Sequence, residues 1–147
     1  MCAYLRVFYR LILFSLLVLI GLLITLFLFP LVSWRSKRRI IKTWSHWLLR
    51  ALGVRLVVDR PPPAIHLQGL MVSNHSSWID IFATNAVQAV RFISKSEIRD
   101  WPVLGRLVTM AGTLYVERGN RSKINETNES IRNAVMAGDL VGFYPEG

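Results

Sequence analysis

The strongest fold signal in this chain is Leu70-Met71-Val72-Ser73-Asn74-His75-Ser76-Ser77-Trp78-Ile79-Asp80. Its first three residues are apolar and suit a buried strand, while the segment that begins at Ser77 suits a helix. Residues five apart on an ideal helix point about 140° away from each other, so His75 and Asp80 cannot meet within one helix. The stretch therefore predicts a strand, a loop that carries His75 and a helix that carries Asp80 in its first turns. Strand-to-helix loops are where α/β proteins commonly place working residues.

Two interpretations of this stretch compete. Ser77-Trp78-Ile79-Asp80 fits a capping box, in which a serine caps a helix and an acid three residues later reaches back to it. That interpretation accounts for Ser77 and Asp80 without catalysis, but not for Asn74 or His75. A histidine with a carboxylate that orients it is the minimum set for activating a hydroxyl group. The motif alone leaves both interpretations open.

Apolar runs and helical pieces alternate through the rest of the second half of the chain. We expect strands at 54–58, 67–73, 91–94, 113–116 and 140–143, and helices at 77–89, 98–110 and 122–136. Pro102 is expected to interrupt the second of these helices, and Gly138 to close the third. This alternation is typical of an α/β domain with a mainly parallel sheet. Because no closing helix follows the last strand, we expect the sheet to have an unfinished edge.

The front of the chain has the composition of a membrane anchor. Residues 11–34 include no charged residue and are long enough to cross a hydrocarbon core of about 30 Å. A signal peptide is disfavoured, because the apolar run is too long and no small-residue cleavage site follows it. A full span and a helical hairpin that dips into one leaflet both remain open.

Residues 34–52 predict an amphipathic helix. Its apolar face consists of Ile40, Ile41, Trp44, Trp47, Leu48, Ala51 and Leu52, and the remainder is mostly basic or polar. Tryptophans opposite basic residues suit a helix that lies in the lipid interface, and packing on an ordinary core is the alternative. We therefore divide the chain into a membrane anchor at 1–53 and an α/β domain at 54–147.

The charge is concentrated at the membrane-proximal end. The net charge is +9; residues 1–60 contain ten Lys or Arg and one acid, while residues 61–147 contain eight of each sign. This distribution favours an anionic lipid surface as partner and gives no support to nucleic acid binding. Basic residues gather just after the apolar span, so for a span that crosses fully the positive-inside rule predicts a domain on the cytoplasmic side. The membrane that we expect is a bacterial inner membrane.

Cysteine and histidine usage excludes some chemistry. Cys2 is the only cysteine and lies at the N-terminus, away from any expected pocket, which disfavours a cysteine nucleophile and a cysteine-based zinc site. The three histidines, His46, His66 and His75, lack metal-binding spacing, so no metal is expected.

Three motifs in order resemble the glycerolipid acyltransferases of the 1-acyl-sn-glycerol-3-phosphate acyltransferase type. The family's first motif, N-H-x-x-x-x-D, is met by Asn74, His75 and Asp80. The second, an acid and an arginine after a strand, is met by Glu117 and Arg118. The third, F-P-E-G-T-R, is met as far as Tyr144-Pro145-Glu146-Gly147, with Tyr in place of the usual Phe. The fourth motif, a proline-containing apolar strand, is absent from this sequence.

The resemblance implies an O-acyltransferase of phospholipid biosynthesis, built as a membrane helix, an interfacial helix and the first part of the family's α/β domain. His75 would be the general base on the free hydroxyl of a lysophospholipid, and Asp80 would orient its imidazole. Arg118 would hold the acceptor phosphate, with Asn74, Glu146 and Gly147 also in the acceptor site. Acyl-CoA or acyl-carrier protein would be the co-substrate, with no further cofactor.

The sequence stops within the third motif. We therefore expect an incomplete domain and an inactive fragment. Two alternatives stay open beside acylation of 1-acylglycerol 3-phosphate to phosphatidic acid. One is an acyltransferase for another acceptor, such as lyso-ornithine lipid or glycerol 3-phosphate. The other is a non-catalytic, membrane-anchored remnant of the fold.

Overall fold

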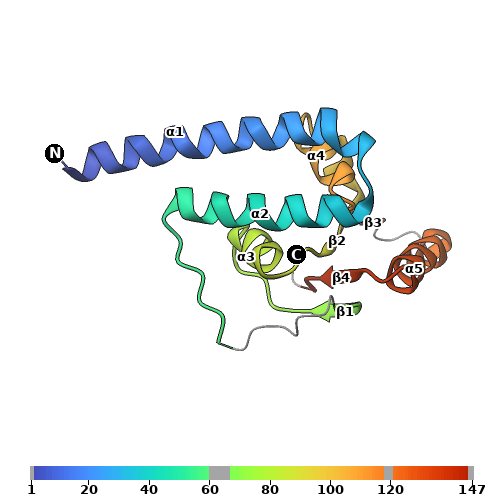
Figure 1. Ribbon diagram of the computed structural model, residues 1–147. Coiled ribbons are helices and arrows are strands. Elements are labelled where there is room, and N and C mark those ends of the chain that lie inside the picture. Colours follow the sequence, from blue (N-terminus) through green and yellow to red (C-terminus); the bar gives the residue numbers. More distant parts are fainter. Residues whose placement is uncertain (1, 60–66, 118–120, 146–147) are drawn as a thin grey trace. The chain divides into compact units, whose positions relative to one another are not determined.

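The computed structural model describes residues 2–59, 67–117 and 121–145. The chain divides into two compact units. The helical unit comprises residues 1–61 and 77–89, and the sheet unit comprises residues 62–76 and 90–147. Figure 1 shows the elements of both units along the chain. Each unit is built around its own packing, so each is described by itself.

The helical unit is a hairpin of two long helices with a third helix beside it. Helix α1 (Cys2–Leu23) continues through a π-helical segment, η1 (Ile24–Leu28), and a 3-10 turn, η2 (Phe29–Leu31). Helix α2 (Trp34–Leu52) then runs back alongside α1 (Figure 1). Helix α3 (Ile79–Val87) packs on α2, where Phe82 meets the indole of Trp44 edge to face at 5.7 Å.

A close approach at Gly21 joins α1 to α2. The indole Nε1 of Trp44 donates a hydrogen bond to the carbonyl of Leu17 at 2.9 Å. A Cβ atom at Gly21 would lie 2.8 Å from the Trp44 ring, so only glycine admits the indole there. The buried Thr25 hydroxyl donates to the carbonyl of Gly21 at 2.7 Å, so its polar atom is satisfied within α1.

The bounds of α2 match the predicted helix at 34–52. Ser33 accepts a hydrogen bond from the backbone of Ser36 at its start, and Gly53 adopts the left-handed conformation (φ 77°) at its end. The buried residues of α2 are Ser45, Leu48, Leu49 and Ala51, of which Leu48 and Ala51 belong to the predicted apolar face. Trp47 on the same helix stays 52% exposed, with the Arg50 guanidinium 5.6 Å from its ring. The helix therefore both packs internally and presents an aromatic and basic surface.

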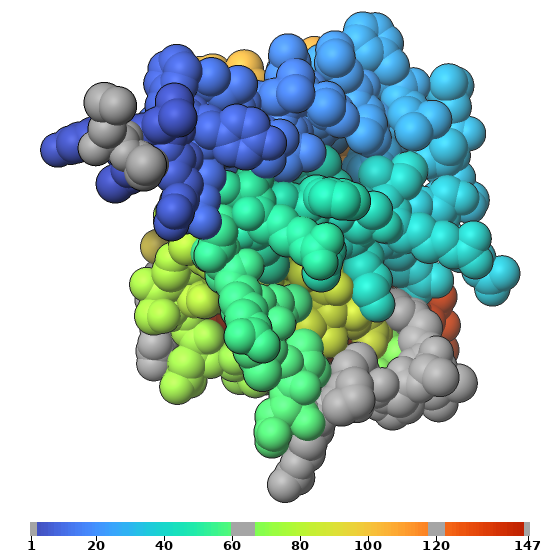
Figure 2. Space-filling model, turned by 60° about the vertical axis from the view of Figure 1, so that its left-hand side comes forward, coloured from blue at the N-terminus to red at the C-terminus, as the bar shows by residue number. Residues whose placement is uncertain are grey.

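Helix α1 is the membrane-spanning candidate of the helical unit. The helical stretch Ala3–Leu31 has 29 residues, and its most apolar window of 18 residues has a mean hydropathy of 3.1. It is the one stretch among the described residues long and apolar enough to cross a membrane. Figure 2 shows α1 in blue, with α2 in teal beside it. Large apolar side chains of α1 are exposed at Tyr4, Leu5, Val7, Phe8, Tyr9, Leu11 and Ile12. Such a surface suits a lipid environment.

The sheet unit confirms the predicted α/β class. Its four strands are β1 (Gly69–Val72), β2 (Arg91–Lys95), β3 (Leu114–Val116) and β4 (Leu140–Phe143). All pairings are parallel, in the order β1-β4-β2-β3. The last strand therefore lies inside the sheet, between β1 and β2, and the edges of the described sheet are β1 and β3.

The helices of the sheet unit match the predicted pattern. They are η3 (Ser96–Asp100, a 3-10 helix), α4 (Leu104–Met110) and α5 (Arg121–Met136). The interruption expected at Pro102 lies between η3 and α4, where Val103 has a positive φ of 64°. Gly138 (φ 88°) follows α5, and its N–H donates to the Val135 carbonyl at 2.9 Å.

The strand predicted at 54–58 is wrong. Those residues form neither helix nor strand in the structure. Val57 and Val58 are 74% and 41% exposed, so the apolar run is not packed into a core. A short apolar run becomes a strand only when a neighbouring strand supplies its hydrogen-bond partners, and none pairs with this one in the described sheet.

One face of the sheet is covered by α5. Its core consists of Leu114, Ala134 and Val141, with Ile93, Ile131 and Val135 packed against them. At the amino ends of β2 and β4, Arg91 forms an ion pair with the buried Asp139 at 3.2 Å. The Arg91 Nε also donates to the Gly112 carbonyl at 2.8 Å. The core and this ion pair hold β2, β3 and β4 in register.

Candidate active site

Residues of all three predicted motifs follow strands at the carboxyl edge of the sheet. All four strands run in the same direction, so their carboxyl ends share one edge. The segments that leave this edge are Asn74-His75 after β1, Ser96-Glu97 after β2, Glu117 after β3 and Tyr144-Pro145 after β4. This is the edge where open parallel sheets bind their ligands.

His75 lies in the loop between β1 and α3, as predicted. The backbone N–H of Ser73 donates to the Phe143 carbonyl at 3.3 Å, which continues the pairing of β1 with β4 one residue beyond the strands. The imidazole of His75 then stacks on the Tyr144 ring, with centroids 4.5 Å apart and 22° between the planes. His75 itself is partly buried. The first and third motifs are therefore adjacent because β1 and β4 are neighbours.

Asp80 lies in the first turn of α3, also as predicted. The backbone N–H of Ser77 donates to its Oδ2 at 2.8 Å, so the carboxylate reaches back as a capping box requires. The Ser77 hydroxyl accepts from the N–H of Ile79 at 3.3 Å. The carboxylate of Asp80 thus makes the hydrogen bond that the capping box predicts. The serine hydroxyl accepts from the N–H two residues later, at Ile79, whereas in the standard box it accepts from the N–H three residues later.

The boundary between the two compact units passes between Ser76 and Ser77. His75 belongs to the sheet unit and Asp80 to the helical unit. Within its own unit, Asp80 is held by α3, whose Trp78 and Phe82 rings meet edge to face at 5.7 Å. Trp78 also meets Phe14 of α1 edge to face, at 6.3 Å. The helix that carries the acid therefore packs on α1 and α2.

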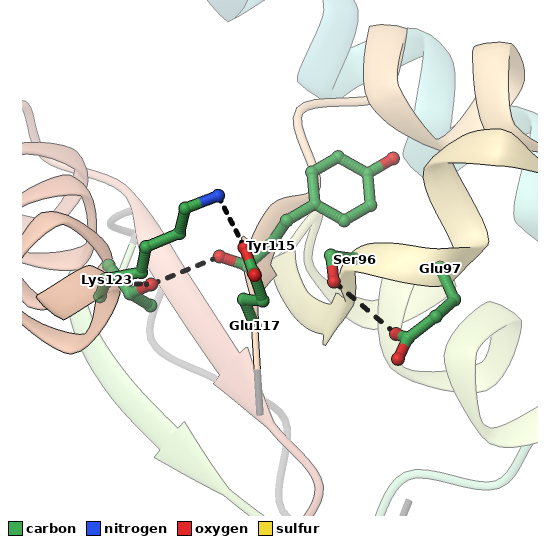
Figure 3. Close-up of polar contacts among 6 residues, drawn as sticks. Ser96, Glu97, Tyr115, Glu117 and Lys123 are labelled. Carbon is green, nitrogen blue, oxygen red and sulfur yellow. Dashed lines mark hydrogen bonds and ion pairs between the residues drawn. The ribbon is translucent and has the colours of Figure 1, made fainter. Parts of the chain in front are cut away.

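Glu117 of the second motif forms an ion pair with Lys123 at the start of α5. The Lys123 Nζ and the Glu117 Oε2 lie 2.6 Å apart (Figure 3). The hydrogen bond from Lys123 to the Glu117 carboxylate raises the pKa of the lysine above its usual 10.5. The Thr127 hydroxyl lies 3.4 Å from the Tyr115 carbonyl and is a further contact of α5 with the end of β3.

The neighbouring loop after β2 is polar. Ser96 donates to the Glu97 carboxylate at 3.5 Å, and the Glu97 side chain is exposed (Figure 3). The Arg99 guanidinium lies 4.4 Å from the centre of the Tyr115 ring, within cation–π range. The Tyr115 hydroxyl is 2.6 Å from that of Thr109. These contacts join η3 and α4 to the end of β3.

Several predicted site residues lie outside the described ranges. These are Arg118, Glu146 and Gly147. Asn74 is described and exposed. Among the residues that the structure describes, no group of three or more His, Cys, Asp or Glu is placed to hold a metal ion.

Sequence reasoning missed Phe92 and the contact role of Tyr144. Tyr144 stacks on Phe92 as well as on His75, with centroids 5.3 Å apart and 15° between the planes. Gly142 lies two residues before Tyr144, and a strand turns residues two apart to the same face. The glycine two residues before an aromatic residue was a signal for a ring packed against the strand. The sequence did not identify Phe92 as that ring.

The sheet unit is therefore a parallel α/β fold with Asn74, His75, Glu117 and Tyr144 in the segments that leave its carboxyl edge. The chain belongs to the Acyltransferase family, whose family model matches residues 40–147. The match begins within α2 and includes α3 and the whole sheet unit.

Curated relatives agree with this membership. The chain is 40% identical over 113 residues to a 1-acyl-sn-glycerol-3-phosphate acyltransferase of Neisseria gonorrhoeae, covering 76% of this chain and 44% of the relative. It is 40% identical over 114 residues to a lyso-ornithine lipid O-acyltransferase of Brucella abortus, covering 76% and 41%. The corresponding enzyme of Pseudomonas aeruginosa is 32% identical over 111 residues, covering 76% and 42%.

The chain spans less than half the length of these relatives. No solved structure matches it. The long apolar helix, together with the lipid acyltransferases to which the chain is similar, marks the protein as a membrane protein.

Proposed function

We propose that the whole protein transfers a fatty acyl group from a thioester donor to the free hydroxyl of a lysophospholipid, converting 1-acylglycerol 3-phosphate to phosphatidic acid. The observation that carries the proposal is the position of His75 at the carboxyl edge, in the loop directly before the helix that carries Asp80. The similarity to a 1-acyl-sn-glycerol-3-phosphate acyltransferase supports the choice of acceptor.

His75 acts as the general base in this proposal. Its imidazole takes the proton of the acceptor hydroxyl as the oxygen attacks the thioester carbonyl of acyl-CoA or acyl-carrier protein. The tetrahedral intermediate expels the thiolate, and the imidazolium returns the proton to the sulfur. Asp80 orients the imidazole and stabilises its charged form. The new ester bond replaces the thioester bond, so the reaction needs no cofactor beyond the acyl donor and no metal.

Four further residues are assigned to the acceptor. Arg118 follows Glu117, and a guanidinium at that position suits a phosphate because it donates two parallel hydrogen bonds. We assign Asn74, Glu146 and Gly147 to the same acceptor site. These assignments predict that Arg118→Ala raises the KM for a phosphate-bearing acceptor more than it lowers kcat.

A second acceptor is favoured by a specific observation. The chain is as similar to a lyso-ornithine lipid O-acyltransferase as to the glycerolipid enzyme, at 40% identity in both comparisons. The same base and acyl transfer serve either acceptor, because both present a free hydroxyl. The two acceptors differ in their head groups, since 1-acylglycerol 3-phosphate carries a phosphate for Arg118 and lyso-ornithine lipid does not.

An acceptor panel tests the proposal. Membranes that contain the whole protein are given a radiolabelled acyl donor, as CoA or as carrier-protein thioester, with 1-acylglycerol 3-phosphate, lyso-ornithine lipid or glycerol 3-phosphate. Phosphatidic acid as the main product supports the first choice, and acylated ornithine lipid supports the second. Binding of acyl donor without turnover on any acceptor would favour the non-catalytic alternative and reject the proposed activity.

We further propose that the sheet unit faces the cytoplasm from a bacterial inner membrane, with anionic lipids as surface partners. Five basic residues, Arg35, Lys37, Arg38, Arg39 and Lys42, follow the apolar helix, against Arg6 and Arg10 within its first turns. This asymmetry supports cytoplasmic placement. Labelling single cysteines placed at exposed sheet-unit positions in intact cells tests it, because a cytoplasmic residue stays unlabelled by an impermeant reagent.

A further inference from the structure

Three aromatic rings form a continuous stack at the carboxyl edge of the sheet. Phe92 comes from β2, Tyr144 from the end of β4 and His75 from the loop after β1. The Phe92 and Tyr144 centroids are 5.3 Å apart at 15°, and the Tyr144 and His75 centroids are 4.5 Å apart at 22°. Tyr144 is therefore enclosed by a ring on each side. The His75 imidazole rests on a ring that is itself supported.

The strand register places Phe92 and Tyr144 on one face of the sheet, and His75 stacks on Tyr144. Gly142 is paired with Phe92 of β2 and with Met71 of β1. Side chains alternate along a strand, so Tyr144 shares the face of Gly142. Val141 points to the opposite face, where it belongs to the core under α5. The stack is thus separate from the packing of α5.

Gly142 makes the space that the stack needs. A Cβ atom at this position would lie 3.0 Å from two carbons of the Phe92 ring and 2.6 Å from Cγ1 of Val90. Phe92 is 8% exposed, so its ring has little freedom to move aside. The missing side chain lets Phe92 lie over β4 and reach Tyr144.

We propose that Tyr144 is a positioning residue for His75, acting through the face of its ring, with Phe92 as its support. The inference rests on the proposed role of His75 as general base. A near-parallel stack restricts rotation of the imidazole about its side-chain bonds, which holds the ring nitrogens in fixed directions. Rates of proton transfer depend steeply on such placement, since a misplacement of about 1 Å costs on the order of a hundredfold. The ring, and not the hydroxyl, supplies this restraint.

Substitution kinetics on the whole protein distinguish the ring from the hydroxyl. Tyr144→Phe keeps the ring and is expected to keep kcat, whereas Tyr144→Leu is expected to lower kcat roughly tenfold to a hundredfold with KM nearly unchanged. Phe143→Leu is the matched control, because Phe143 is an aromatic residue at the neighbouring position on the other face of β4. It is expected to leave kcat unchanged. An equal loss of kcat in Tyr144→Phe and Tyr144→Leu would assign the effect to the hydroxyl and overturn the proposal.

A spectroscopic measurement tests the stack without any catalysis. The chain has three histidines, and His75→Gln identifies the imidazole signals of His75 in the NMR spectrum of the histidine-labelled chain in micelles. A ring stacked on a tyrosine face has imidazole protons shifted upfield by the ring current. The shift is expected to persist in Tyr144→Phe and Phe143→Leu and to disappear in Tyr144→Leu.

The two readouts separate this inference from the proposed function. A His75 signal without upfield shift in the unmodified chain would overturn the stack itself. A shifted signal that responds as expected, in a protein that acylates no acceptor, would reject the proposed function while the stack stands. A shift lost in Tyr144→Leu together with normal kcat would show that the stack does not position the base.

Discussion

The backbone N–H of Ser77 donates a hydrogen bond to Oδ2 of Asp80 at 2.8 Å. The same carboxylate is the group that we propose orients His75, so a structural and a chemical role fall on one side chain. A carboxylate has two oxygens with about four acceptor sites, and one hydrogen bond occupies only part of that capacity. Capping and catalysis are therefore compatible for Asp80, and substitutions can separate them.

Asp80→Asn removes the charge and keeps an oxygen that can accept the Ser77 hydrogen bond. We expect α3 to stay folded and kcat to fall at least about a hundredfold, because a neutral amide no longer stabilises the imidazolium that forms during general-base catalysis. The measurement is acyl transfer at saturating substrates, with thermal unfolding recorded on the same sample.

Ser77→Ala is the control for the cap. It removes the hydroxyl that accepts the Ile79 N–H at 3.3 Å, and it is expected to cost about 1 kcal/mol of stability without changing kcat. If Asp80→Asn and Ser77→Ala lose stability and activity in the same proportion, Asp80 acts only as a cap.

His75→Ala tests the base itself. We expect the acylation rate of the whole protein to fall at least about a hundredfold, the lower end of what a positioned general base contributes. His46→Ala is the matched control, because His46 is an exposed histidine of α2. A near-normal rate in His75→Ala would remove the role that we assign to this residue.

The Arg91–Asp139 ion pair predicts a local contribution to stability. Asp139 has 3% of its side chain exposed and Arg91 has 25%. We expect Asp139→Asn to lower the free energy of unfolding by about 1.5–3 kcal/mol, the range for hydrogen bonds to charged groups. Glu129→Gln makes the same chemical change on the exposed side of α5 and should shift stability by less than about 0.5 kcal/mol. Equal effects of the two changes in denaturant unfolding would contradict this assignment.

Gly142→Ala is expected to destabilise the sheet unit by about 1–3 kcal/mol, the usual cost of overpacking. The added Cβ would meet Cγ1 of Val90 at 2.6 Å. Val90→Ala removes that methyl group, so the double variant Val90→Ala with Gly142→Ala should cost less than the sum of the two single changes. Denaturant unfolding of the four proteins measures this coupling, and strict additivity would argue against the clash.

Lys123 gives a prediction in alkaline solution. The hydrogen bond to Glu117 raises the pKa of Lys123, so the ion pair contributes fully below pH 10.5 and is lost as the pH rises through the raised pKa. Glu117→Gln should lower the pKa of Lys123 toward 10.5, as followed by NMR of the lysine side chain. Glu126 also raises this pKa, but by its charge alone, so Glu126→Gln should lower it less. A larger effect of Glu126→Gln would contradict the pairing with Glu117.

The elements with local signals were predictable from the sequence. Helix α2 begins after the N-cap Ser33 and ends before the C-cap Gly53. Both caps lie directly beside the helix in the sequence, so its bounds have a local signal. The four paired strands were recognised as short apolar runs between turn signals. The same criterion failed at 54–58, because an apolar run does not reveal whether a partner strand exists. The acid of the capping box was also readable, since both partners lie within four residues.

The apolar helix, the parallel α/β class and the loop position of His75 follow from the amino-acid sequence. The position of β4 between β1 and β2, and the stacking of Tyr144 between Phe92 and His75 that results from it, follow from the tertiary structure alone. Periodicity reports which face a residue takes within its own element, whereas strand order depends on crossovers between segments distant in the chain. The space at Gly142 has the same origin, because the ring that fills it comes from another strand.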